Sequence, residues 1–447
     1  MLDRKRSQCG ASGRSRRSPL LAAAALLCLA GSASDSFGQA TASQAAPTAI
    51  RAADFLNSIG VNVHVEYTDG KYANISQVVS DLAYVGVTHV RDATLIPTNQ
   101  GQSSYDALAT AGIKFDLFVQ GRDIGPSLSL LGKFARAHPG AVEAIEGPNE
   151  INNFPVAYSG LTGAAAGLAY QSALYRGVSA DPVLSGTPVF SLTDNAYFSA
   201  TADFSNVHPY PHEGAQPYPV LADTLARQLR AAPGKPVVMT ETGYYSLPNG
   251  VGWGGVDLQT HAKLTINLLL DAAKLGYRKT YIYQLLDAYP DPTNRDQERH
   301  FGFFDIGNNA KPVATALHNL SAILKDDGAT GSTFAVGALP VQITGLPSSG
   351  FSLVLQKSSG AFDVVVWNEP QVWDNARHAP IATGSSTITV DFGGRFAHVT
   401  AYDPLTGLKP VAAATAADRL QLPISDRPLV IEVSGPLQAA GRARPAL

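Results

Sequence analysis

A short apolar run leads directly into polar residues in the stretch Val142-Glu143-Ala144-Ile145-Glu146-Gly147-Pro148-Asn149-Glu150. A second run does the same in Val237-Val238-Met239-Thr240-Glu241-Thr242-Gly243. Each run has the length of a buried β-strand and is followed by glycine or proline, which commonly end strands. We therefore expect two buried strands, Val142–Glu146 and Val237–Glu241, with a glutamate at or just beyond the carboxyl end of each.

Similar runs rich in Val, Ile, Phe and Tyr recur on both sides of these two, with longer helical stretches between them. Alternating strands and helices are typical of βα units arranged around a parallel sheet. Eight strands predict a (β/α)8 TIM barrel. The expected strands are Gly60–Val65, Thr88–Asp92, Lys114–Val119, Val142–Glu146, Val183–Thr187, Phe204–His208, Val237–Glu241 and Thr280–Gln284.

Three of the intervening helices carry clear boundary signals. Ile75–Val85 is followed by Gly86, and His261–Lys274 is followed closely by Gly276. Glycine just past the last turn is a common helix stop. Pro312–Leu324 begins with proline, which suits a first turn, and it would complete the eighth βα unit.

The pattern changes beyond residue 328, where alternating apolar and polar residues predict strands with one buried face. The expected strands are Phe351–Gln356, Phe362–Trp367, Ser386–Asp391, His398–Asp403 and Leu429–Val433. They predict a small all-β sandwich that supports the barrel. Trp367 and Trp373 are expected in its core or at the domain interface, with independent carbohydrate binding as the alternative.

The 447 residues suit a barrel of about 250 residues and a smaller companion domain. The predicted divisions are a signal peptide and leader at 1–40, a flexible start at 41–54, the barrel at 55–327, the sandwich at 328–436 and a disordered tail at 437–447.

The first 40 residues have the layout of a secretory signal peptide. Basic residues precede the apolar run Leu20–Ala30, and small residues follow around Ala33 and Ala40. The run is shorter than the roughly 20 residues that span a membrane. We therefore expect a secreted or periplasmic protein with no membrane association after cleavage. Ser15–Leu21 also resembles a twin-arginine signal, which is the alternative export route.

Charge and cysteine content narrow the class of partner. Removal of residues 1–40 takes away both cysteines, six basic residues and two acidic ones, so the net charge falls from −3 to −7. The mature chain would then form no disulfide. A mildly acidic chain without a basic stripe argues against nucleic acid as a partner.

The two glutamates are expected to meet. In a TIM barrel the residues at the carboxyl ends of the strands surround the active site. Glu150 follows the fourth expected strand and Glu241 ends the seventh, so both belong to this rim. Two carboxylates are therefore expected to face one another across the mouth of the barrel.

Gly147-Pro148-Asn149-Glu150 and Thr240-Glu241-Thr242-Gly243 resemble the signature of glycoside hydrolase clan A. Gly60-Val61-Asn62-Val63-His64 is most similar to family 39 and related polysaccharide-degrading families. The resemblance implies a retaining hydrolase acting on β-linked glycosides. It also implies that Glu150 is the acid/base and that Glu241 is the nucleophile, which forms a covalent glycosyl-enzyme.

The same resemblance suggests roles for three neighbours. Tyr210 is similar to the clan tyrosine that donates to the nucleophile, and Arg91 to the arginine that lowers the nucleophile's pKa. Asn149 would hydrogen-bond the sugar 2-OH. For Arg91 the alternative is a structural ion pair with Asp92 or Asp116.

Further residues are expected to contact the sugar, each with a structural alternative. His64 and His208 stand at strand ends, although both would also suit a satisfied core position. Strand 8 carries Tyr283 and Gln284 where the clan often has tryptophan, and strand alternation lets only one of them face inward. Trp253, in the glycine-rich loop at 249–255, would either stack on a sugar or pin its loop.

No cofactor or metal is expected. His208 and His212 have a metal-like spacing, but Pro209 and Pro211 forbid the helix that would bring the histidines to one face. The acidic loop Asp287–Glu298 lacks the ordered spacing of a calcium loop, so we expect it to be solvated. Glu146 is expected to be structural.

Three rival functions remain open. A transglycosylase would use the same intermediate and pass it to a sugar. A catalytically inactive barrel would use the carboxylates to bind carbohydrate. A lyase or aldolase would need a lysine or a metal cluster at the strand ends, which the sequence does not display. In the first two the partner is still an oligosaccharide or polysaccharide.

Overall fold

The computed structural model describes residues 48–94, 101–121, 123–328 and 330–437. The predicted signal peptide and almost all of the predicted C-terminal tail lie outside these residues. None of the helices in the described parts is both long and apolar enough to cross a bilayer.

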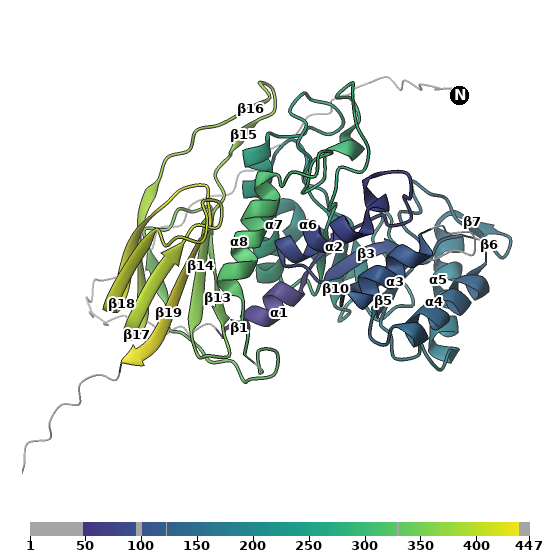
Figure 1. The fold of residues 1–447 in the computed structure, drawn as a ribbon, viewed down its shortest axis with the longest axis horizontal. Helices are drawn as coiled ribbons and strands as arrows, with labels where there is room; N and C mark the ends of the chain where they lie inside the picture. The colour runs from purple at the N-terminus through teal and green to yellow at the C-terminus, as the bar shows by residue number, and fades with distance from the viewer. Residues whose placement is uncertain (1–47, 95–100, 122, 329, 438–447) are drawn as a thin grey trace, which may run out of the picture. The chain divides into compact units, whose positions relative to one another are not determined.

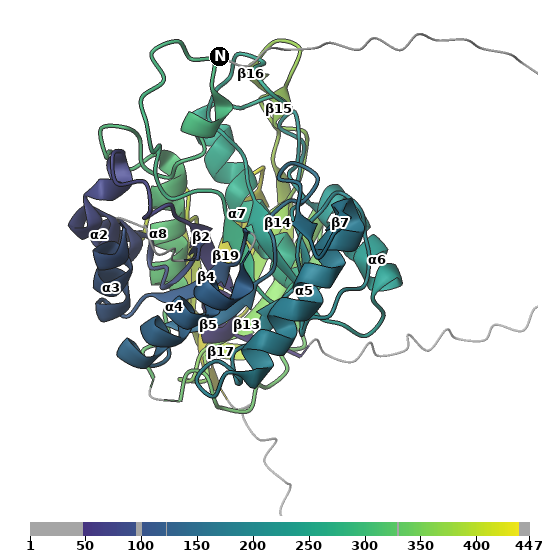
Figure 2. The same cartoon turned by 90° about the vertical axis from the view of Figure 1, so that its right-hand side faces the viewer.

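The described residues form a closed barrel of eight parallel strands, as predicted. The strands are β2 (Ile59–Asn62), β3 (His89–Ala93), β4 (Lys114–Phe118), β5 (Val142–Glu146), β8 (Val189–Phe190), β9 (Ser205–Val207), β10 (Val237–Thr242) and β11 (Thr280–Ile282). A parallel bridge between Phe190 and Phe204 joins β8 to β9 and closes the ring. The barrel lies at the centre of Figure 2, surrounded by its helices.

The helices follow the predicted pattern. They are α1 (Ala52–Asn57), α2 (Ile75–Val85), α3 (Gln102–Thr110), α4 (Ile124–Ala137), α5 (Gly163–Ala180), α6 (Tyr218–Ala231), α7 (Leu258–Leu275) and α8 (Pro312–Leu324). Gly86 and Gly276 cap α2 and α7 with φ of 73° and 88°. Asp257 caps the start of α7 by accepting a hydrogen bond from the backbone N–H of Thr260.

The predicted fifth strand was wrong in position. Residues 183–187 form a turn, because the Asp181 carboxylate accepts hydrogen bonds from the backbone N–H groups of Val183 and Leu184 at 2.8 and 3.2 Å. The strand is the short β8, which begins after Pro188. In sequence, this segment looks like a strand. The backbone N–H groups, however, are hydrogen-bonded to a side chain instead of to a neighbouring strand, which the sequence does not reveal.

The C-terminal β region is confirmed, with differences in its strands. It contains β12 (Gln342–Thr344), β13 (Gly350–Gln356), β14 (Phe362–Asn368), β17 (Ser386–Tyr402), β18 (Ala412–Ile424) and β19 (Leu429–Leu437). Two predicted strands, at 386–391 and 398–403, are halves of the single long β17. The alanine-rich β18 was not predicted, because its exposed positions carry few strand-forming side chains.

The predicted flexible start was wrong for residues 50–54. Ile50 and Arg51 form β1, which pairs in parallel with β13 of the β region, and α1 follows at once. The Arg51 guanidinium also donates to the backbone carbonyl of Phe334 at 2.7 Å. The chain therefore enters the barrel through the β region, a long-range pairing that local sequence does not reveal.

The β region packs against α7 and α8 of the barrel (Figure 1). Trp367 is fully buried there, and its indole N–H donates to Asp271 of α7 at 3.0 Å. Asn319 of α8 donates to the carbonyl of Pro404 at 2.7 Å, and Lys263 of α7 pairs with Asp426 at 2.6 Å. The two parts thus share apolar and polar contacts.

Candidate active site

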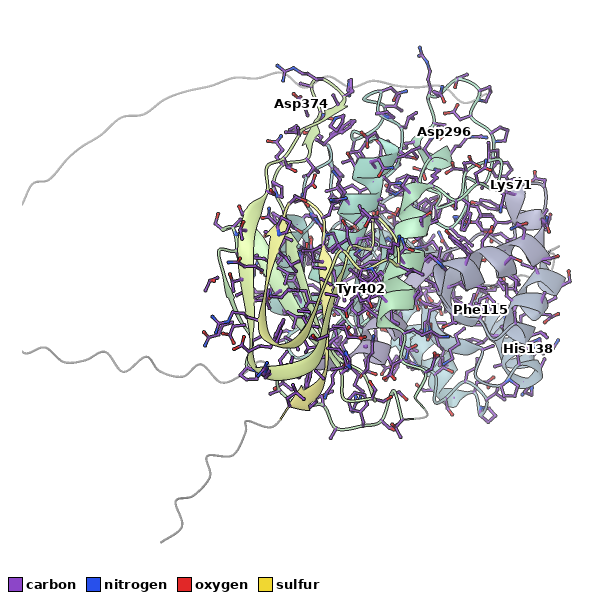
Figure 3. All side chains as sticks on the ribbon, turned by 60° about the vertical axis from the view of Figure 1, so that its left-hand side comes forward. Lys71, Phe115, His138, Asp296, Asp374 and Tyr402 are labelled. Carbon is purple, nitrogen blue, oxygen red and sulfur yellow. The ribbon has the colours of Figure 1, made fainter. Side chains whose placement is uncertain are left out.

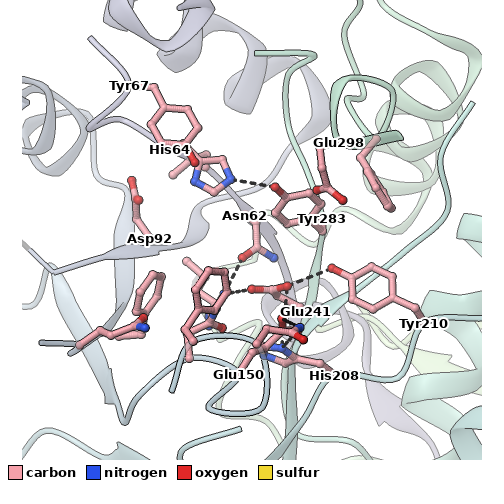
Figure 4. Close-up of a pocket in the computed structure, with 18 of the residues that line it drawn as sticks. Asn62, His64, Tyr67, Asp92, Glu150, His208, Tyr210, Glu241, Tyr283 and Glu298 are labelled. Carbon is pink, nitrogen blue, oxygen red and sulfur yellow. Dashed lines mark hydrogen bonds and ion pairs between the residues drawn. The ribbon is translucent and has the colours of Figure 1, made fainter. Parts of the chain in front are cut away.

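A cavity of about 740 Å³ opens at the carboxyl ends of the barrel strands. It is lined by nine of the ten predicted site residues: His64, Arg91, Asn149, Glu150, His208, Tyr210, Glu241, Trp253 and Tyr283. Figure 4 shows Glu150 and Glu241 close together at its base, with His64 and Tyr283 on the opposite side. The strand ends therefore bring together residues that are far apart in the sequence.

The two glutamates face one another across a short gap. One carboxylate oxygen of Glu150, one of Glu241 and a ring nitrogen of His208 all lie within 4.8 Å of each other. Retaining glycosidases hold their carboxyl groups about 5–5.5 Å apart, whereas inverting enzymes leave a gap of about 6.5–9.5 Å for a water molecule. The separation here matches the shorter class.

Glu241 is held by two donors. Arg91 donates from Nη1 to Oε1 at 2.5 Å, and the Tyr210 hydroxyl donates to Oε2 at 3.0 Å. Burial, together with the nearby charge of Glu241, raises the pKa of Tyr210 well above its usual range, so the hydroxyl remains a donor. The two contacts fix the position of the Glu241 carboxylate.

Arg91 organises the base of the cavity. Its guanidinium forms a bidentate pair with Glu146, at 2.7 Å for both bonds, and also donates to Asn62 and to Asn149. The direct ion pairs of Arg91 are therefore with Glu146 and Glu241, and the expected alternative pairing with Asp92 or Asp116 is wrong. Because Asn149 accepts through Oδ1, its Nδ2 is the group left to donate to a sugar hydroxyl.

A chain of hydrogen bonds fixes the proton on His208. The amide oxygen of Asn206 accepts from both the backbone N–H and the hydroxyl of Thr240, which uses the single hydroxyl proton. The Thr240 oxygen must then accept from Nε2–H of His208, at 2.9 Å. Nδ1 of His208 lies 3.0 Å from Oε1 of Glu150. This last contact therefore contains one proton, carried either by Nδ1 or by Glu150.

The pKa of Glu150 reflects that contact. Burial alone would raise this pKa, but hydrogen bonds from His208 and Asn153 and the charges of His208 and Arg91 lower it to about 2. This differs from the raised pKa expected of a general acid. A charged His208 explains the difference, since an imidazolium stabilises the carboxylate, whereas a neutral His208 would leave the proton on Glu150.

The backbone also constrains Glu150. Its φ is +41°, a left-handed conformation that non-glycine residues seldom adopt outside functional sites. The Glu150 backbone N–H donates to the Thr193 hydroxyl at 2.9 Å, and Asn153 donates to Oε2 at 2.8 Å. Sequence reasoning missed Thr193 and Asn153, because each acts through a loop whose path is not legible in sequence.

Tyr283 and Gln284 lie just beyond β11, which ends at Ile282, and of the two only Tyr283 lines the cavity. The Tyr283 hydroxyl lies 3.3 Å from Nε2 of His64 in the cavity wall. Gln284 is 2 % exposed, accepts from the Tyr72 hydroxyl and donates to the Glu298 carbonyl. Gln284 therefore has a structural role, and its prediction as a sugar ligand was wrong.

Trp253 lines the cavity among other aromatic rings. It stacks on His212 with ring centroids 5.4 Å apart and contacts Tyr210, Tyr245 and Phe301 at centroid distances of 5.7–6.1 Å. Its side chain is half-buried, so one side of the ring is accessible from the cavity.

Three carboxylates in the cavity wall were not predicted as site residues. Glu298 comes from the acidic loop; it is exposed, as expected of that loop, and it also lines the cavity. Glu66 and Asp92 lie together beside His64, and burial and the charge of Glu66 raise the pKa of Asp92 well above its usual range. Their acidic character was visible in sequence, but nothing local indicated that they face the cavity.

Two groups of side chains among the described residues could geometrically hold a cation: His64, Glu66 and Asp92, and Glu150, His208 and Glu241. In the first group Asp92 already accepts from the backbone N–H groups of Val65 and Ala93. In the acidic loop, Asp287 pairs with Lys311 at 2.7 Å and Asp291 accepts from several loop amides. These contacts compete with any cation for the same oxygens.

The protein resembles known proteins in its structure and not detectably in its sequence. No family model matches the sequence, and neither does any curated protein. A GH39 enzyme from Xanthomonas axonopodis pv. citri matches with a TM-score of 0.57 and 13% identity, over 87% of this chain and 96% of the other. A monomeric beta-xylosidase from Caulobacter crescentus CB15 matches with a TM-score of 0.56 and 14% identity, over 87% and 98%. A glucosidase from Croceicoccus marinus matches with a TM-score of 0.55 and 11% identity, over 80% and 91%.

These matches extend across both the barrel and the β region. The chain therefore shares the fold of glycoside hydrolase family 39 enzymes, as its motifs predicted. At these identities the likeness concerns the fold, and the activity must be argued from the residues in the cavity.

Proposed function

We propose that this protein is a retaining glycoside hydrolase that cleaves β-linked glycosidic bonds of an oligosaccharide or polysaccharide. The observation that supports this most strongly is the Glu150–Glu241 pair, with oxygens within 4.8 Å of each other at the base of a large cavity. The different surroundings of the two carboxylates support their different roles.

In the first step Glu241 attacks the anomeric carbon, and the bond from that carbon to the glycosidic oxygen breaks. The proton shared by Glu150 and His208 passes through Glu150 to the departing oxygen. Arg91 and Tyr210 hold the Glu241 carboxylate in position for attack. The product of this step is a glycosyl ester of Glu241 and a released alcohol.

In the second step a water molecule attacks the same carbon. Glu150, now ionised, takes the water proton while the ester bond to Glu241 breaks. The Glu150–His208 pair thereby recovers its proton, and the anomeric configuration is retained. Asn149, through its remaining N–H groups, would bind the sugar 2-OH and stabilise the transition state.

We also propose that the protein is exported to the periplasm or secreted. The basic residues and the short apolar run at the N-terminus support this, as does the acidic balance of the remaining chain. A polymeric or oligomeric sugar outside the cytoplasm is the substrate class that fits such a location.

The direct test is incubation with a panel of neutral, acidic and amino polysaccharides, followed by chain-length analysis of the products. Glu241→Gln serves as the matched control, because it removes the nucleophile while preserving side-chain volume. We expect new reducing ends from at least one substrate with the native protein only. Equal release by the variant, or release of none, would contradict the proposal.

The same products distinguish hydrolysis from sugar transfer. A transglycosylase yields chains longer than the starting oligosaccharide, whereas a hydrolase yields only shorter ones. An inactive carbohydrate-binding barrel would bind the polymer without changing its length. The Glu150–Glu241 pair favours catalysis over binding alone, because binding does not require two carboxylates within 4.8 Å of each other.

A further inference from the structure

We propose that a hairpin of the β region positions Trp253 and so completes the wall of the cavity. The hairpin consists of β15 (Trp373–Asp374) and β16 (Ala379–Pro380), and we call residues 372–381 the β15–β16 hairpin. The stretch at 249–255 is called the Trp253 loop. The role in sugar binding rests on the proposed function, whereas the positioning of the loop does not.

The hairpin projects from the β region toward the end of the barrel where the cavity opens. Figure 1 shows β15 and β16 above the β sheet, level with the loops beyond α7. Figure 3 shows Asp374 of the hairpin at the same end of the molecule as Asp296 of the acidic loop. A part of the β region thus lies beside the active-site loops.

Three glycines allow the hairpin to pack closely against the neighbouring loops. A Cβ atom placed on Gly214 would lie 2.5 Å from Cδ1 of Trp373, and one on Gly254 would lie 2.7 Å from Oδ1 of Asn375. One on Gly250 would lie 2.6 Å from Cε1 of His378. All three have positive φ, of 66°, 90° and 72°. Both the close approach and the backbone conformation therefore require glycine at these positions.

The hairpin is firmly held on its own side. Trp373 is 1 % exposed and packs, with Val372, in the main apolar core of the barrel. Gln216 donates to the carbonyl of Pro370 just before the hairpin, at 2.7 Å. The Asp374 carboxylate accepts from the backbone N–H groups of Ala376 and Arg377, which stabilises the turn.

The Trp253 loop connects these contacts to the cavity. The backbone carbonyl of Trp253 accepts from the N–H of Glu213 at 2.9 Å, next to the Gly214 that receives Trp373. The Trp253 ring itself stacks on His212 and lines the cavity. The loop is therefore held between the hairpin on one side and the cavity aromatics on the other.

A loop with four glycines at 249–255 has little conformational preference of its own. Its order must come from its neighbours, which include Asn375 and His378 of the hairpin beside Gly254 and Gly250. Trp373 lies outside the cavity lining, so it would act through Trp253 as a positioning residue. Loss of the hairpin contact should loosen the loop and spare Glu150 and Glu241.

The first test uses fluorescence and needs no substrate. The chain has three tryptophans, so Trp253 is the only emitter in Trp367→Phe/Trp373→Phe and in Trp367→Phe/Trp373→Ala. Phenylalanine keeps a ring against Gly214, whereas alanine leaves a gap. We expect acrylamide to quench Trp253 about twofold more strongly in the alanine variant, because a loosened loop opens more often. Equal quenching in the two variants would overturn the proposal.

A control separates the hairpin from general destabilisation of the β region. Phe392→Ala, added to the double phenylalanine variant, removes a fully buried ring from the separate core of the β sheet. Quenching of Trp253 should stay unchanged in folded samples of this variant, checked by thermal unfolding. An equal rise in quenching would mean that Trp373 has no specific role.

The second test uses activity and a matched pair of glycines. Gly214→Ala would introduce both backbone strain and a clash with Trp373, whereas Gly234→Ala at φ +76° meets nothing within 4 Å and introduces the strain alone. We expect Gly214→Ala to raise KM severalfold for long oligosaccharides and to leave kcat on an aryl glycoside nearly unchanged. A uniform fall in kcat, or equal effects of the two substitutions, would contradict positioning. If no carbohydrate is cleaved at all, the proposed function fails while the quenching result still decides the role of the hairpin.

Discussion

The barrel contains two histidine–glutamate pairs with almost the same geometry and different surroundings. His89 and Glu143 lie 2.8 Å apart toward the amino ends of the strands, and His208 and Glu150 lie 3.0 Å apart at the carboxyl ends. In both pairs the pKa of the glutamate is lowered to about 2 against the effect of burial. The pairing alone therefore does not identify a catalytic group.

What differs is the set of remaining partners. Glu143 also contacts Lys279 at 3.2 Å and the Tyr281 hydroxyl at 3.0 Å, so protein groups surround it. Glu150 lines the cavity, has a strained backbone and lies beside a second carboxylate. A pair whose remaining neighbours are protein groups stabilises the fold, whereas a pair that opens to a cavity can exchange its proton with a ligand.

The largest expected effect comes from Glu241, the second carboxylate, which lies beside the His208–Glu150 pair and has no counterpart at the His89–Glu143 pair. Glu241→Ala should lower kcat by about 10⁵-fold, because it removes the attacking carboxylate. Azide should restore turnover of an activated aryl glycoside and give a glycosyl azide of inverted configuration. Activity of the variant at the native level would exclude Glu241 as the nucleophile.

Glu150→Ala should have the next largest effect, and the effect should depend on the leaving group. Loss of the acid should cost about 10²–10⁴-fold with a poor leaving group, and far less at the first step with a nitrophenolate that needs no proton. Rates measured over a series of aryl glycosides check this. A loss of equal size across the series would count against an acid role.

A substitution in the His89–Glu143 pair should change the stability of the protein rather than its activity. Glu143→Gln should lower the free energy of unfolding by about 2 kcal/mol at neutral pH, because Lys279 then loses a half-buried charged partner. The lowered pKa of Glu143 means that its contribution is present above its ordinary value of 4.5 and is lost as pH falls toward about 2. Urea unfolding at several pH values should therefore show a shallower acid dependence in the variant. An unchanged stability with lost activity would reverse the assignment of the two pairs.

The smallest expected effect is a shift in the pH profile. In His208→Asn, Glu150 alone must keep the proton that the pair keeps in the native protein. The alkaline limb of kcat/KM should therefore move to lower pH, by about 1–2 units. An unmoved limb would show that the shared proton takes no part in catalysis.

The parts of the fold that could be predicted from sequence are those with local signals. The bounds of α2 and α8 followed from apolar spacing and their glycine and proline boundaries. Glu150 and Glu241 could be located because glycine and proline mark the end of each strand and because strand ends converge in a barrel. His64 and Tyr283 were likewise placed by strand position.

What could not be predicted depends on contacts between distant segments. The pairing of β1 with β13 and the bend within β17 have no local signature. Tyr283 and Gln284 were equivalent in sequence, and both lie beyond the end of β11, where strand alternation does not decide which one faces the cavity. The glycines of the Trp253 loop indicated a turn, but the close approach at Gly250 and Gly254 comes from His378 and Asn375, more than a hundred residues away.

The central claim is that Glu241 forms a covalent intermediate while Glu150 exchanges a proton, and the configuration of the first product tests it most directly. Proton NMR can follow hydrolysis of a β-glycoside from the first minutes, before mutarotation. Double displacement through Glu241 predicts that the β-anomer appears first and the α-anomer only later. First appearance of the α-anomer would mean inversion and would exclude a covalent intermediate on Glu241.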